Sequence, residues 1–167
     1  MCVGAACGGV FLALLSPLIS RRSHRRMANI GYLVLVGIAL HNLPEGLAVG
    51  SSLVHSTQFA LSLALLMLLH NIPEGLAVCV PLRLSGMRAP KMLLLALLTG
   101  LPTAAGALIG TAVGSVSPRM IAACLSFAGG AMLYISLKEL LPAAGAKKRT
   151  LPALLGIGVG IIFTALV

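Results

Sequence analysis

The chain has 167 residues, of which 59% are hydrophobic and only 9% charged, a balance typical of a polytopic membrane protein and not of a soluble domain. Its formal net charge is +9. The basic residues lie in short breaks between apolar runs with no interleaved aromatic residues, which argues against a nucleic acid partner.

Six apolar runs are long enough for spanning helices, which need about 20 residues within a range of roughly 17–25. We therefore predict an all-α, multi-pass membrane protein in which residues 1–167 form a single transmembrane domain. In chain order, the predicted helices lie near 3–19, 30–54, 58–82, 92–114, 119–142 and 151–167.

The breaks between these helices predict an orientation. The first, third and fifth breaks are basic, whereas the second has no Lys or Arg and the fourth has Arg119 alone. Under the positive-inside rule the odd-numbered breaks face the cytoplasm, so both termini are predicted to lie outside it, in a cell (inner) membrane protein. The basic residues of these breaks are Arg21, Arg22, Arg25 and Arg26, then Arg83, Arg88 and Lys91, then Lys147, Lys148 and Arg149.

The second and third predicted helices carry the same pattern, His-Asn-x-Pro-Glu-Gly, at residues 41–46 and 70–75. Two of the three acidic residues of the chain lie in these motifs, although a carboxylate near the bilayer centre costs roughly 2.5–3.5 kcal/mol. At 1.5 Å per residue, both histidines lie roughly 16–18 Å into the membrane, near its midplane. An antiparallel pair of helices with matching polar groups at that depth is typical of a transporter.

Spacing within each motif indicates a metal site. His and Glu are four residues apart and share a helix face, and Asn lies three residues before the same Glu, so one carboxylate could serve two adjacent subsites. The motif proline leaves the carbonyl four residues earlier without its N–H partner. A packing role explains a single His–Glu pair, but two copies favour divalent metal chemistry. The predicted ligands are His41, Asn42, Glu45, His70, Asn71 and Glu74.

The third acid, Glu139, lies near the cytoplasmic end of the predicted helix at 119–142. Two interpretations stay open for it. Glu139 is either an interfacial acid balanced by Lys138 and the basic cluster at 147–149, or a further metal ligand on the exit path.

The tandem motif resembles the fourth and fifth transmembrane helices of the ZIP (Zrt-, Irt-like) divalent-metal transporters, especially bacterial zinc-uptake members. Residues 128–142 resemble the seventh helix of that family. The resemblance implies an eight-helix fold, of which this chain has helices 3–8 and lacks the first two. It also implies a paired metal site between the two motif helices and uptake of divalent cations into the cytoplasm. His41, Glu45, His70 and Glu74 would form the first subsite, and Asn42 and Asn71 would join the shared glutamates in the second.

One position departs from the family pattern. Members often carry a Glu-Pro pair in the helix that corresponds to 92–114, whereas this chain has Thr103 where that Glu would stand. The second subsite is therefore expected to be poorer in charge. Imidazole and carboxylate together suit Zn²⁺, Fe²⁺, Mn²⁺ and Cd²⁺, and the resemblance favours Zn²⁺ as the transported substrate.

Two other functions would also place His and Glu on a membrane helix. An intramembrane metalloprotease needs His-Glu-x-x-His, which is absent together with any Asp, so the chain is not expected to be an enzyme. A truncated or degenerate relative that binds metal, or associates with a partner, without transporting it is the alternative. The expected partners are a divalent metal ion and the lipid bilayer, and a homodimer is left open.

Overall fold

The computed structural model describes residues 2–20, 26–114, 116–143, 155 and 158, and this part of the chain is helical and contains no strand. The helices are α1 (Cys2–Ser20), α2 (Arg26–His55), α3 (Thr57–Leu84), α4 (Ala89–Leu98), α5 (Leu101–Val113) and α6 (Pro118–Ile135). A π-helical turn, η1 (Ser136–Leu140), and the short α7 (Leu141–Ala143) continue α6.

Five segments are long and apolar enough to cross a membrane: Cys2–Ile19, Arg26–His55, Thr57–Leu84, Ala89–Val113 and Pro118–Ala143. The predicted all-α, multi-pass class is therefore confirmed. The predicted helix at 151–167 lies outside the described residues, apart from Leu155 and Gly158.

The predicted helix at 92–114 is one span but two helices, because α4 ends and α5 begins around Thr99 and Gly100. Pro102 has no N–H to bond the carbonyl of Leu98, and glycine is a poor helix former. The N–H of Thr99 bonds the carbonyl of Ala96, and the N–H of Gly100 that of Leu97, so the last turn of α4 tightens to i→i−3 bonds. This break lies inside the apolar span.

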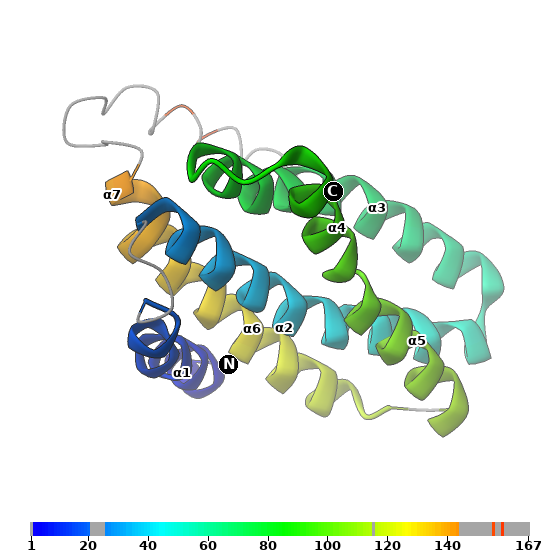
Figure 1. Ribbon diagram of the computed structural model, residues 1–167. Helices are drawn as coiled ribbons and strands as arrows, with labels where there is room; N and C mark the ends of the chain where they lie inside the picture. Colours follow the sequence, from blue (N-terminus) through cyan, green and yellow to red (C-terminus); the bar gives the residue numbers. More distant parts are fainter. Residues whose placement is uncertain (1, 21–25, 115, 144–154, 156–157, 159–167) are drawn as a thin grey trace.

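Helix α2 lies in the middle of the bundle and packs against α3, α5 and α6, while α1 packs mainly against α6 (Figure 1). The α2–α5 contact is close because glycines line it on both sides. A Cβ at Gly46 would meet the carbonyl oxygen of Thr103, and a Cβ at Gly106 would meet that of Leu43. Small residues at such crossings let helix backbones approach within a membrane.

The apolar core lies towards the Arg26 end of α2. Ile30, Leu33, Val34 and Ile38 of α2 are almost fully buried there, against residues of α1, α3 and α6. In contrast, α3 is mostly exposed, since only about 11% of the residues in its most apolar stretch are buried. The two motifs therefore lie on one central helix and one peripheral helix.

Candidate metal centre

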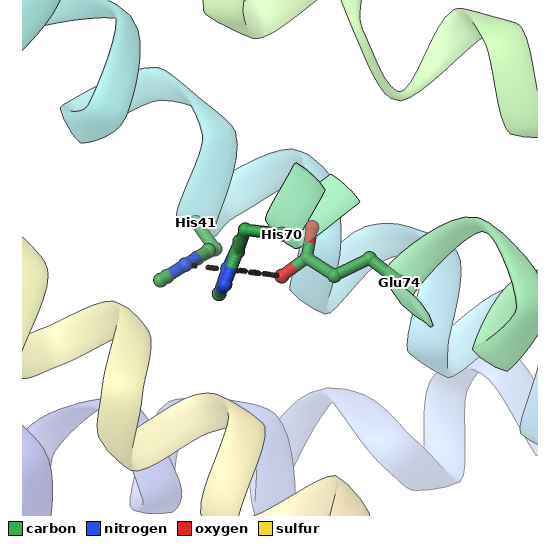
Figure 2. Close-up of side chains that lie close together, drawn as sticks. All are labelled: His41, His70 and Glu74. Atoms are coloured by element: carbon green, nitrogen blue, oxygen red, sulfur yellow. Dashed lines mark ion pairs between the residues drawn. The ribbon is translucent and has the colours of Figure 1, made fainter. Parts of the chain in front are cut away.

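Helices α2 and α3 form an antiparallel pair joined at Ser56, which brings the two motifs side by side. The hydroxyl of Ser56 caps α3 by accepting the N–H of Phe59 at 3.3 Å, so α3 begins directly after α2 ends. Both helices continue through their motif prolines, Pro44 and Pro73. Figure 2 shows His41 of α2 and His70 and Glu74 of α3 pointing towards one another.

Two histidines and two glutamates form a closed set of contacts at this point. Within the motifs, Nε2 of His41 lies 2.9 Å from Oε1 of Glu45, and Nε2 of His70 lies 3.2 Å from Oε1 of Glu74. Across the helix pair, His41 lies 3.8 Å from Glu74, and His70 lies 3.6 Å from Glu45. Each carboxylate therefore contacts the imidazole of its own motif and that of the other.

Three of these four side chains, His41, His70 and Glu74, are placed so that they could hold a metal ion together. Ligand atoms of His41, His70 and Glu74 all lie within 4.8 Å of one another, and the two imidazole rings are 5.6 Å apart between centroids. Both glutamates are buried, at 6% and 8% exposure, whereas the His70 side chain is 45% exposed. The centre is thus enclosed on its α2 side and open beside His70.

Most of the buried polar side-chain atoms that show no hydrogen bond in the described structure lie in this region. Native proteins leave few such atoms, because each costs free energy. These atoms carry the lone pairs that a cation accepts, so the residues present fit a divalent metal. They include Nδ1 of His41, Oδ1 of Asn42, Oε2 of Glu45, Oδ1 of Asn71, Oε2 of Glu74 and Oγ1 of Thr103.

Asn42 connects the motif on α2 to the break between α4 and α5. Its side-chain N–H donates to the carbonyl of Thr99 at 2.7 Å, in a buried bond. The amide nitrogen of Asn42 is thereby engaged, and its Oδ1 is left as an acceptor. Sequence reasoning missed Thr99, although the Gly-x-Pro sequence that follows it was a signal for a helix break.

Thr103 stands on the first turn of α5, and its backbone packs against Gly46, one residue after Glu45. Its hydroxyl oxygen is buried without a partner. The α5 helix therefore brings a neutral oxygen, and no carboxylate, to the side of α2 that carries the motif.

Glu139 does not join the other predicted ligands. It is partly buried in η1, and its Oε1 accepts a hydrogen bond of 3.4 Å from the hydroxyl of Ser16 in α1. Its carboxylate thus contacts α1 and not the four converging side chains of the α2–α3 pair.

A hollow of about 490 Å³ lies between α2, α3 and α6 at the end of the bundle that contains His55. On α2 it is lined by Ala48 and Ser52, which follow Glu45 at three- and four-residue steps on one helix face. On α3 it is lined by Leu63, two turns before His70. We call this the His55 hollow. It lies along the same faces of α2 and α3 as the candidate metal centre.

In a comparison with known families, the family model described as ZIP Zinc transporter matches residues 5–167. Neither the search of curated proteins nor that of solved structures gives a match. The family match covers both motifs and every residue of the centre described above.

Proposed function

Because the chain belongs to the ZIP zinc transporter family, we propose that its α2–α3 centre binds a divalent cation, most readily Zn²⁺, and passes it into the cytoplasm. Members of this family are metal transporters and not enzymes, and five spans make this chain a multi-pass membrane protein. What we propose beyond family membership is which residues bind the metal, which metal is bound and in which direction it is transported.

One observation carries the proposal. Glu45 and Glu74 are both buried, and each lies within 4 Å of both histidines. Two buried carboxylates beside the same pair of imidazoles are unfavourable when both are ionised, because like charges repel and burial penalises charge. A divalent cation between them neutralises both charges, and imidazole nitrogens complete a donor set that suits Zn²⁺.

Charge also decides how the two subsites differ. We assign His41, Glu45, His70 and Glu74 to the first ion, which leaves the centre neutral overall. A second ion beside Asn42 and Asn71 would share the same glutamates and add two uncompensated positive charges. Because Thr103 supplies only a hydroxyl, the second subsite is expected to bind more weakly than the first.

The His55 hollow supports a route to the centre. It follows the α2 and α3 faces that carry the ligands, and the turn beside it, at Ser56, has no Lys or Arg. The positive-inside rule predicts that this turn lies outside the cytoplasm, so the hollow is the proposed outer approach. Its lining is mostly apolar, and Ser51, Ser52 and His55 are the polar residues in it.

Uptake of ⁶⁵Zn²⁺ by proteoliposomes, together with equilibrium Zn²⁺ binding to the purified chain, tests this function. Glu45→Gln and Glu74→Gln should each abolish both binding and uptake, since each glutamate serves both histidines. Glu139→Gln is the matched control, because it removes the third carboxylate of the chain, which contacts Ser16 instead.

Binding and uptake separate the two candidate functions. Zn²⁺ bound by the wild-type chain without uptake would identify a relative that holds metal without moving it. Full binding by Glu45→Gln or Glu74→Gln would contradict the proposed centre itself. Competition by Fe²⁺, Mn²⁺ and Cd²⁺ in the same vesicles ranks the metals.

A further inference from the structure

A groove of about 380 Å³ lies on the other side of the metal centre from the His55 hollow. It is bounded by α2, α3 and the segment η1–α7 that continues α6. The residues that line it are all apolar. Its lining on α3 runs from Pro73, directly before Glu74, to Leu84, which is the last residue of that helix. We call this the apolar groove.

The apolar groove follows an exposed apolar face of α3. On α3, Leu76, Val80 and Leu84 line it and are 60%, 53% and 70% exposed. In a membrane span, such side chains face hydrocarbon. A hydrated ion finds no polar partner there, so the chemistry of the groove favours an apolar chain as its occupant.

The turn that follows Leu84 is strongly basic. Arg83, Arg88 and Lys91 are exposed, and the segment from 83 to 91 contains no acid. A second hollow of about 280 Å³ lies at this turn and is lined by Ser85, Gly86, Met87, Arg88 and Lys91. We call this the basic turn.

Two further features shape the basic turn. The guanidinium of Arg83 donates to the carbonyl of Met87 at 3.1 Å, which holds its charge over the turn. Helix α4 begins at Ala89, and its N-terminal end adds partial positive charge at the same place. An anionic group is therefore favoured there on three counts: side-chain charge, the helix end and the absence of any competing carboxylate.

We propose that the apolar groove and the basic turn together bind one anionic phospholipid. An acyl chain lies in the groove along α3, and the phosphate lies at Arg88 and Lys91. The positive-inside rule predicts that this turn lies on the cytoplasmic side, where anionic lipids attract Lys and Arg. A second copy of this chain fits less well, because in the same orientation it would bring the same positive charge to the turn.

Native mass spectrometry of the full chain in detergent, with one lipid added at a time, tests the proposal. Phosphatidylglycerol should be retained at one molecule per chain, whereas phosphatidylcholine with identical acyl chains should be retained at least tenfold less. The Arg88→Gln/Lys91→Gln double variant should lose phosphatidylglycerol by roughly tenfold or more. Both side chains are exposed, so helical circular dichroism should be unchanged.

Two further variants complete the test. Arg119→Gln is the charge-matched control, because Arg119 lies in the first turn of α6, at the opposite end of the bundle. This variant should retain phosphatidylglycerol as the wild type does. Val80→Trp, which fills the groove, should weaken retention while the basic turn stays intact. Equal retention of the two lipids, or a double variant no weaker than Arg119→Gln, would overturn the proposal. None of these readouts depends on metal transport.

Discussion

The side chain of Asn42 in α2 donates a 2.7 Å hydrogen bond to the backbone carbonyl of Thr99, where α4 ends. Asn42 is only 2% exposed, so this bond is made away from water. It couples a motif residue to a helix break within a membrane span. Irregular backbone at that depth is tolerated where a neighbour satisfies it, and Asn42 is that neighbour.

Replacing Asn42 by Asp should lower stability, because an ionised Asp cannot donate and would place its oxygen against the Thr99 carbonyl. We expect the free energy of unfolding to fall by roughly 1–3 kcal/mol, the usual cost of an unsatisfied buried group. Thermal unfolding in detergent without added metal measures it. Asn71→Asp is the matched control in the second motif, where the described residues show no such bond to a helix break. An equal loss in both variants would argue against the Thr99 contact.

The two motif glycines should respond oppositely to alanine. A Cβ at Gly46 would run into the Thr103 carbonyl, whereas a Cβ at Gly75 meets nothing within 4 Å. Gly46→Ala should therefore cost roughly 1–3 kcal/mol through forced separation of α2 and α5. Gly75→Ala should stabilise α3 by roughly 0.5–1 kcal/mol, because alanine is the better helix former. The sign of the change in unfolding midpoint decides the point, and a stabilising Gly46→Ala would contradict the close contact.

Thr103→Glu should raise the number of Zn²⁺ ions bound per chain from one towards two. The new carboxylate would stand beside the Glu45 turn of α2 and offset part of the charge of a second ion. Calorimetric titration gives the stoichiometry. Thr103→Gln, which has nearly the same size but no charge, should leave it at one. If Gln and Glu behave alike, charge does not limit the second subsite.

Orientation can be checked by labelling single cysteines in a variant from which Cys2, Cys7, Cys79 and Cys124 have been removed. Thr57→Cys, at the exposed start of α3, should react with an impermeant thiol reagent added to intact cells. Arg88→Cys, in the basic turn, should react only after the membrane is permeabilised. The reverse pattern would invert the predicted topology and the direction of transport.

Much of this protein was predictable from local sequence. Apolar length and the sparsity of charge determine the all-α, multi-pass class, because a bilayer admits few alternatives to helices of that length. The repeated motif also predicts that His41, Glu45, His70 and Glu74 converge, since spacing by four places His and Glu on one face and adjacent antiparallel helices place both motifs at one depth. In the structure, Nε2 of each histidine lies within 4 Å of Oε1 of both glutamates.

Other features were decided by the tertiary structure alone, because they depend on contacts between distant segments. Asn42 bonds Thr99 across 57 residues, and nothing in the motif itself indicates that partner. Gly46 and Gly75 occupy equivalent motif positions, yet only Gly46 lies against α5. Glu139 had two open interpretations, and it turns towards Ser16 because α1 packs on that side of α6. Sequence determines which groups are available, and helix packing determines which of them meet.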